Sequence, residues 1–374
     1  MIGALLFWSS IGVVAYTYAG YPLLVAALAQ QRGRAPREAD LQPPLTVVVA
    51  AYNEQSRIAG RVHDILAQDY PAHRLRVLVV SDGSNDCTAR EAALDDSRVS
   101  VLALPHNVGK AQALNLALEQ VDTELVAFTD ARQRYGEGAL RALVAPFADA
   151  DVGAVSGDLV LEPATGAGHE VGLYWRMEKA LRADEARLGW LHGVSGAVYA
   201  LRRELFEPLP AGTVLDDMWV PLHVLLAGRR VWMARTAIAY DQSSADATEE
   251  FHRKLRTLAG NWQLLARLPV LMDPTRNPVF FAWFSHKFLR LLVPWALLVA
   301  LFASALTPGW LYRLAFIAQL LGYAWAIAGL RLPRLAARVP LLPAAGTFLM
   351  LNLAALLSLP ASLAWHPSRL WKKH

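Results

Sequence analysis

The chain has 374 residues, of which 55% are hydrophobic and only 18% are charged. Soluble domains are about 25% charged, so this composition argues against a wholly soluble protein and leaves room for one globular domain with several membrane spans. The net charge of +4 is modest, and the basic residues cluster beside apolar runs. This pattern indicates membrane orientation and speaks against a nucleic-acid partner.

Four stretches contain no Asp, Glu, Lys or Arg: 1–31, 291–312, 314–330 and 339–368. A membrane-spanning helix needs about 20 mostly apolar residues. We therefore expect an N-terminal transmembrane helix over 1–30 and a C-terminal region of about three spans over 291–365. Ala27-Leu28-Ala29 resembles a signal-peptidase site, but no basic residue precedes the apolar stretch, which favours a retained anchor.

The basic residues beside these runs predict which side of the membrane the globular part faces. They are Arg32, Arg34, Arg37, Lys287, Arg290, Arg331, Arg334 and Arg338. If all of them face the cytosol, the positive-inside rule is satisfied and the domain over 43–272 is cytosolic. The expected location is the inner (plasma) membrane. The tail residues Arg369, Lys372 and Lys373 would then lie outside, against the rule, so either the last run is a re-entrant hairpin or the tail is an exception.

Strand-like and helix-like segments alternate between residues 45 and 162. The expected strands are 45–51, 77–80, 99–103 and 125–129, and the expected helices are 55–68, 86–94 and 109–120. This order predicts an α/β fold with a Rossmann-like, mostly parallel sheet and flanking helices. Further along, we expect helices at 168–188, 216–227 and 248–267 and a strand at 230–240. Ligands of such sheets bind at the carboxyl ends of the strands.

Polar residues follow the first two expected strands. Tyr52 and Glu54 come directly after the first strand, and Asp82 follows the second. The Asp82 carboxylate is suited to accept the N3–H of a uracil, with Tyr52 or Glu54 holding base and ribose. The alternative is an ordinary turn, because Asp82-Gly83 is a strong turn signal.

Two more polar residues stand at the next element ends. Lys110 opens a helix, where its charge adds to the positive helix end and suits a phosphate, although a solvated lysine is the simpler alternative. Asp130 ends the fourth strand. A carboxylate there, next to a diphosphate, is suited to bind Mg²⁺ or Mn²⁺. A lone aspartate in a loop is otherwise merely solvated.

Taken in order, these short motifs resemble those of inverting family-2 glycosyltransferases with a GT-A fold. The motifs are Tyr52-Asn53-Glu54, Asp82-Gly83-Ser84, Asn107-Val108-Gly109-Lys110 and Thr129-Asp130-Ala131. The membrane layout is similar to the branch of hyaluronan, cellulose and poly-N-acetylglucosamine synthases. The resemblance implies a UDP-sugar donor, a saccharide or polyprenyl-linked acceptor, a role in extracellular or cell-envelope polysaccharide synthesis, and possible export or assembly partners.

The resemblance also implies a general base on the acceptor side. The pair Asp216-Asp217 matches the family's Glu-Asp motif, with Asp217 at the position of the base, and such a base contributes about 10²–10⁴-fold to the rate. The alternative is that the pair only caps a helix. Gly196, within the Gly-rich turn 193–197, would face the donor and acceptor sugars.

The chain departs from the family pattern in two places. The family's Asp-x-Asp metal motif is Asp130-Ala131-Arg132 here, so Arg132 would neutralise phosphate charge directly. The processive synthases carry Gln-(Gln/Arg)-x-Arg-Trp, where this chain has 253–257. Arg253 and Arg256 would present a basic face to the leaving UDP, but the sugar-stacking Trp is missing, although Trp262 follows. Processive and single addition therefore both remain open.

An amphipathic segment precedes the second apolar run. Phe280, Phe284 and Phe288 are spaced four residues apart, which predicts an interfacial helix over 276–290 lying along the lipid headgroups. The alternative is a helix packed on the globular domain.

Three other classes of function have less support in the sequence. A non-catalytic sugar-nucleotide-binding subunit of an assembly complex is supported by the incomplete metal motif alone. A transporter is disfavoured because the apolar runs contain no acidic residue. A dehydrogenase or P-loop protein is excluded because no Gly-x-Gly-x-x-Gly or Gly-x-x-x-x-Gly-Lys-[Ser/Thr] motif follows a strand.

Overall fold

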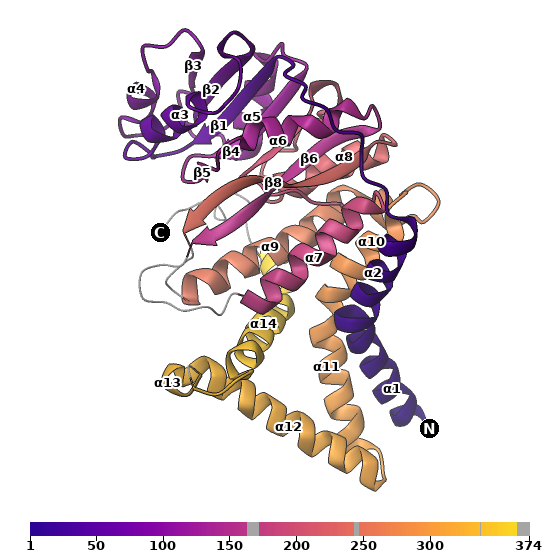
Figure 1. Cartoon of the computed structure of the whole chain (residues 1–374). Coiled ribbons are helices and arrows are strands. Elements are labelled where there is room, and N and C mark those ends of the chain that lie inside the picture. The colour runs from indigo at the N-terminus through magenta and orange to yellow at the C-terminus, as the bar shows by residue number, and fades with distance from the viewer. Residues whose placement is uncertain (163–171, 243–246, 337, 365–374) are drawn as a thin grey trace.

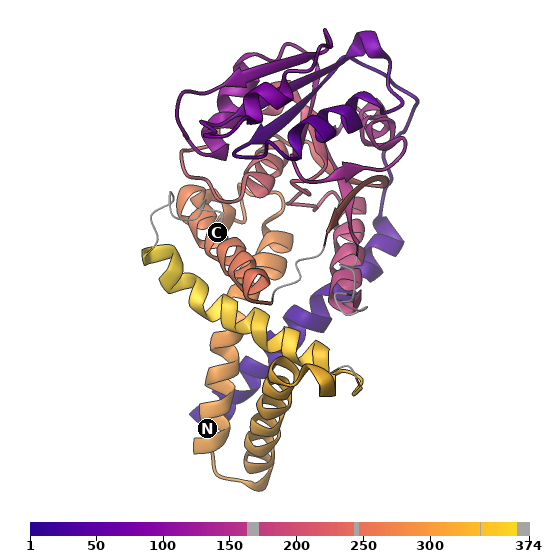
Figure 2. The ribbon, with the colours of Figure 1, turned by 90° about the vertical axis from the view of Figure 1, so that its left-hand side faces the viewer.

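The computed structural model describes residues 1–162, 172–242, 247–336 and 338–364. Figure 1 shows an α/β domain at one end of the molecule and long apolar helices at the other, with α7 (Gly172–Arg187) and α9 (Ala247–Arg267) between them. The N-terminus lies at the end of the first helix that is farthest from the sheet (Figures 1 and 2).

The described residues form one eight-stranded sheet with the order β3-β2-β1-β4-β7-β6-β8-β5. Its strands are β1 (Leu45–Ala51), β2 (Leu75–Ser81), β3 (Val99–Ala103), β4 (Leu125–Asp130), β5 (Arg134–Tyr135), β6 (Val152–Glu162), β7 (Tyr199–Arg202) and β8 (Arg230–Gln242). Strands β3, β2, β1 and β4 run parallel, whereas β7 is antiparallel to both β4 and β6. The expected α/β fold is confirmed, although the sequence pattern did not reveal β5, β6 or β7.

Both faces of the sheet are covered by helices, which explains why its parallel strands are continuously apolar. Successive residues of β1 point to opposite faces, so Val48 packs with one core and Val47 and Val49 with the other. The core around Val48 contains α5 (Lys110–Glu119) and α8 (Asp216–Leu226). The opposite core contains α3 (Ile58–Leu66) and α6 (Ala139–Val144).

The remaining helices of this domain are short and connect the larger elements. They are η2 (Ala72–Arg74), α4 (Thr88–Ala92), η3 (Ala145–Ala148), η4 (Arg203–Leu205) and η5 (Pro269–Met272). The part of the expected helix 168–188 before residue 172 lies outside the described residues.

The register of the parallel strands gathers their carboxyl ends. Ala51 of β1 pairs with Ser81 of β2, and Ala50 pairs with Asp130 of β4. The segments that follow β1, β2 and β4 therefore leave the sheet at one edge, where a ligand of a parallel sheet binds.

Four helices in the described residues are long and apolar enough to cross a membrane: Ile2–Arg32, Phe280–Leu306, Trp310–Arg331 and Leu342–Ala364. The first comprises α1 (Ile2–Ala15), η1 (Tyr16–Gly20) and α2 (Tyr21–Arg32), and the second comprises α10 (Phe280–Trp283), η6 (Phe284–Phe288) and α11 (Leu289–Leu306). The others are α12 (Trp310–Arg331) and α14 (Leu342–Ala364), joined through α13 (Pro333–Ala336). Because α10 and η6 form one continuous helix with α11, the structure does not separate an interfacial helix from the span that follows. The interfacial helix over 276–290 therefore stays a prediction.

Candidate active site

The Asp82 carboxylate organises the loop that precedes α5. Its two oxygens accept hydrogen bonds from the backbone N–H groups of Val108 (2.7 Å) and Gly109 (2.9 Å) and from the side-chain amide of Asn107 (3.0 Å). Gly83 has a positive φ of 62°, and a Cβ there would lie 2.2 Å from the backbone N of Asn107. Only glycine allows the two loops to approach so closely.

These bonds limit what Asp82 can offer a ligand. A carboxylate has about four acceptor sites, and three are used within the protein. Burial raises the pKa of Asp82, although the N–H groups of Val108 and Gly109 act in the opposite direction. The hydrogen bonds of Asp82 therefore fix the start of α5. Contact between Asp82 and a nucleotide base remains a prediction.

Tyr52 and Glu54 lie in the neighbouring loop after β1. The backbone N–H of Glu54 donates to Thr88 Oγ1 at 2.8 Å, and its buried carboxylate accepts a bond from Arg57 at 2.9 Å. Tyr52 is half-buried at the same sheet edge. The loops after β1 and β2, which carry Tyr52 and Asp82, thus form one continuous surface, called here the wall of Tyr52 and Asp82.

Lys110 brings two carboxylates together at the centre of the site. Its ammonium lies 3.0 Å from Asp130 Oδ1 and 2.9 Å from Asp216 Oδ2. Burial acts to lower the pKa of Lys110, but the charges of Asp130 and Asp216 outweigh it and hold the pKa well above its usual value. The ammonium is therefore a permanent cation between the end of β4 and the start of α8.

Asp217 follows directly on α8. Its backbone carbonyl accepts a bond from Val194 N–H at 2.9 Å, and Gly196 lies beside its side chain. A Cβ on Gly260 of α9 would lie 2.7 Å from Leu215 Cγ, so this glycine lets α9 pack closely against the residue before the pair. The structure thus brings together Lys110, Asp130, Asp216, Asp217 and Gly196.

The environment of Asp217 suits a proton acceptor. Burial, and then the charge of Asp216, raise the pKa of Asp217 to about 6. Its carboxylate forms no hydrogen bond with any residue that the structure describes. A base with a pKa just below neutrality is ionised at pH 7 and still basic enough to take up a proton.

This pKa predicts an acidic limb in the pH profile. The base acts only when ionised, so kcat/KM should rise as the pH increases from 5 and level off above about 7, with a midpoint near 6. Initial rates between pH 5 and 8 at subsaturating substrate measure this midpoint. A limb centred near the ordinary aspartate value of about 4 would contradict the assignment.

A cavity of about 260 Å³ extends from Asp217 toward the apolar helices. Its walls come from α7, the turn after it, α9, η6 and α14. Tyr18 and Asn352, from the first and last apolar helices, also line the cavity and are hydrogen-bonded to each other. The cavity thus joins Asp217 to two of the apolar helices.

Two of the three basic residues expected at the donor form ion pairs within the protein. Arg132 is 2.8 Å from the buried carboxylate of Asp241 on β8, and Arg253 pairs with Glu250 on its own helix. Neither Arg253 nor Arg256 lines the cavity, whereas Lys254 between them does. Their contact with phosphate stays a prediction.

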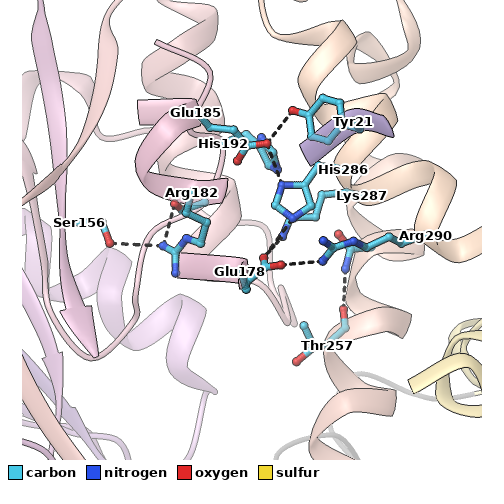
Figure 3. Close-up of polar contacts among 12 residues, drawn as sticks. Tyr21, Ser156, Glu178, Arg182, Glu185, His192, Thr257, His286, Lys287 and Arg290 are labelled. Carbon is cyan, nitrogen blue, oxygen red and sulfur yellow. Dashed lines mark hydrogen bonds and ion pairs between the residues drawn. The ribbon is translucent and has the colours of Figure 1, made fainter. Parts of the chain in front are cut away.

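Sequence reasoning did not identify a buried ionic group on the cavity wall. Glu178 accepts hydrogen bonds from Arg290 (2.8 Å) and His286 (3.0 Å), and Glu185 bonds to the other nitrogen of His286 (2.8 Å), as Figure 3 shows. Glu178, Arg182 and Glu185 are spaced by four and three residues. This spacing places them on one face of α7 and was the available signal.

Comparison with known proteins gives an independent indication. Residues 46–209 match the family described as Glycosyl transferase family 2. The chain is 31% identical over 175 residues to an N-acetylglucosaminyltransferase of Rhizobium meliloti, covering 45% of this chain and 41% of that one. It is 32% identical over 123 residues to an N-acetylglucosaminyltransferase of Bradyrhizobium elkanii, covering 32% of this chain and 67% of that one.

One solved structure matches almost the whole chain. The mannosyltransferase PcManGT from Pyrobaculum calidifontis, in complex with GDP-Man and Mn²⁺, superposes with a TM-score of 0.73 at 24% identity, covering 96% of this chain and 99% of that one. This likeness shows a shared GT-A fold. By contrast, the chain spans less than half the length of the R. meliloti relative.

Proposed function

Because the chain belongs to glycosyl transferase family 2, we propose that it transfers a sugar, with inversion, from a nucleotide-diphosphate donor to an acceptor beside Asp217. The chain is a glycosyltransferase; its donor, acceptor and membrane face are the subject of the proposal. The observation that carries it is the position of the Lys110 ammonium, within about 3 Å of both Asp130 and Asp216.

The donor diphosphate would lie where these loops meet. Lys110 is the first residue of α5, where its charge adds to the partial positive charge of the N–H groups at the helix N-terminus. The wall of Tyr52 and Asp82 would hold the nucleotide, and we propose a UDP-sugar. Gly196 would leave space for the sugar next to Asp217.

A divalent cation fits the same place. Asp130 Oδ1 contacts Lys110, and Oδ2 forms no hydrogen bond with any residue that the structure describes. With diphosphate oxygens it makes an all-oxygen ligand set of the kind that Mg²⁺ and Mn²⁺ prefer. When bound, the cation supplies charge neutralisation of the diphosphate leaving group. The Arg132 guanidinium already pairs with Asp241, and its predicted contact with phosphate would come in addition to the cation.

Removal of this carboxylate should separate metal binding from folding. We expect Asp130→Asn to lower turnover at least about 100-fold and to weaken Mn²⁺ binding in the presence of UDP, because it loses the protein's charged ligand. Water proton relaxation with UDP and Mn²⁺ measures the binding directly. Asp122→Asn, which alters an exposed pair with Arg76, is the control and should bind Mn²⁺ normally. Unchanged Mn²⁺ affinity in Asp130→Asn would rule out this ligand.

Asp217 would remove the proton from the acceptor hydroxyl as that oxygen attacks the anomeric carbon from the face opposite the diphosphate. Attack from that face inverts the configuration. Since the cavity joins Asp217 to the apolar helices, the acceptor would be a polyprenyl-linked sugar or a saccharide delivered at the membrane. The basic residues beside the spans favour the cytosolic face of the inner membrane.

The proposal is tested with the full chain in lipid nanodiscs and a panel of UDP- and GDP-sugars. We expect nucleotide diphosphate release with one donor, transfer of its labelled sugar, and an inverted linkage in the product. Product length on a gel distinguishes repeated from single addition. Binding of a nucleotide sugar with no turnover, in the presence of Mn²⁺ and lipid extract, would contradict the proposal.

A further inference from the structure

Three side chains that can ligate a metal converge on the wall of the cavity that also contains Asp217. Glu185 comes from the end of α7, His192 from the loop after it, and His286 from η6 (Figure 3). One ligand atom from each lies within 4.8 Å of the others. All three residues are buried, with 0%, 1% and 1% of their surface exposed.

Both histidines are oriented by partners on the ring nitrogen that faces away from a ligand. His192 Nδ1 lies 3.0 Å from the carbonyl oxygen of Trp190, and His286 Nε2 lies 3.0 Å from Glu178 Oε1. An N–H at each of these positions leaves His192 Nε2 and His286 Nδ1 with a lone pair. Metal-binding histidines almost always have such a carbonyl or carboxylate partner.

Glu185 has an unused oxygen in the same group. Its Oε1 accepts a bond from Tyr21 at 2.7 Å and is 2.8 Å from His286 Nδ1, whereas Oε2 is buried without a hydrogen-bond partner. A buried carboxylate oxygen without a partner is uncommon in a folded protein and calls for an explanation such as an ion.

We propose that Glu185, His192 and His286 bind a transition-metal dication, with Zn²⁺ as the best match. Two imidazoles and one carboxylate form a ligand set that zinc accepts, while Mg²⁺ prefers oxygen alone. The metal would take the place of the contact between His286 Nδ1 and Glu185 Oε1, and the hydrogen bond from His286 Nε2–H to Glu178 would remain. All three residues line the cavity, so a fourth position is open to it.

The position of this site indicates what the metal would do. His286 lies in the π-helical turn η6 at the start of an apolar helix, and Tyr21 begins α2. His192 directly precedes the turn whose Val194 N–H bonds to the Asp217 carbonyl. The metal would thus fasten two membrane helices to the turn beside the proposed base. This site is separate from Asp130 and does not depend on the proposed sugar transfer.

Metal content tests the inference without any turnover. The full chain, purified through a histidine-free tag without chelators, is expected to contain about one zinc per chain by plasma mass spectrometry. Glu185→Gln and His192→Ala should each lower zinc affinity at least about 10-fold. His223→Ala is the matched control and should keep its zinc, because His223 also bonds a carbonyl through Nδ1 but lies outside the cluster.

A second measurement covers variants that do not fold. X-ray absorption of the zinc-loaded wild-type chain should show two imidazoles and oxygen ligands in the first shell. Sulfur in that shell would implicate Cys87 and overturn the assignment. A wild-type chain that neither contains zinc nor binds it in a titration would also overturn it.

Discussion

Asp217→Asn is expected to lower the turnover of sugar transfer by about 10²–10⁴-fold while nucleotide affinity stays nearly unchanged. The amide has almost the same size but cannot take up the acceptor proton. Since the raised pKa of about 6 comes from burial and Asp216, the substitution also removes a buried charge and should not destabilise the fold. Turnover is measured as UDP release in nanodiscs, and affinity by calorimetry with UDP and Mn²⁺.

Two features make this result specific. Asp122→Asn changes an exposed aspartate in a pair with Arg76 and is expected to retain full turnover. The acceptor-independent hydrolysis of the donor, where it occurs, should fall together with transfer, because water also needs a base. If Asp217→Asn kept more than about a tenth of wild-type turnover, the assignment of the base would be wrong.

Lys110→Met is expected to produce the second large effect, and its primary effect should be on nucleotide affinity. A charged contact to a diphosphate contributes about 1.5–3 kcal/mol, so UDP affinity should fall by about 10–150-fold and turnover with it. The loss also leaves Asp130 and Asp216 without their shared cation. Because Asp130 is 39% exposed, we expect a stability cost below the roughly 3–5 kcal/mol of a fully buried broken pair.

The chain offers a matched lysine for comparison. Lys179 lies 2.8 Å from Asp158 and is about as buried as Lys110, but its partner is on β6 and not in one of the three donor loops. Lys179→Met should therefore lose stability without losing UDP affinity. Lys110→Arg should fold and recover part of the affinity. Equal UDP affinity in the Lys110→Met and wild-type chains would remove Lys110 from the donor site.

The sequence predicted which strand ends meet at one edge of the sheet because a parallel sheet has a simple geometry. Strands β1, β2 and β4 are continuous apolar runs, and their carboxyl ends must share one edge. Polar residues directly after those runs, such as Asp82 and Asp130, therefore had to lie close together. The family resemblance then assigned Asp217, which no local pattern distinguished from a helix cap.

Other features were beyond the sequence because they depend on tertiary packing. The sequence could not predict that Asp82 holds the loop before Lys110, because this role depends on how closely Gly83 packs on Asn107. The ion pair between Arg132, which follows β4, and Asp241 on β8 joins residues more than 100 positions apart in the sequence. Strand β7 is four residues long and antiparallel within an otherwise parallel neighbourhood, and so short a segment has little periodicity to detect.

The buried group around His286 shows a further limit of sequence reasoning. Its members come from three helices, two of which read as apolar membrane segments. A lone histidine before an apolar run carries no pattern of its own. Only the packing of α7 against η6 and α2 makes Glu178 and Glu185 its partners.

The central claim is that Lys110, Asp130 and Asp217 surround one donor, and a structure of the full chain in nanodiscs with UDP and Mn²⁺ tests it most directly. We expect the diphosphate to lie beside the Lys110 ammonium and Mn²⁺ to bind the Asp130 carboxylate. The side of the β-phosphate that the protein leaves uncovered should face Asp217 across the cavity. A nucleotide bound at another surface, or with its diphosphate remote from Lys110, would contradict the account.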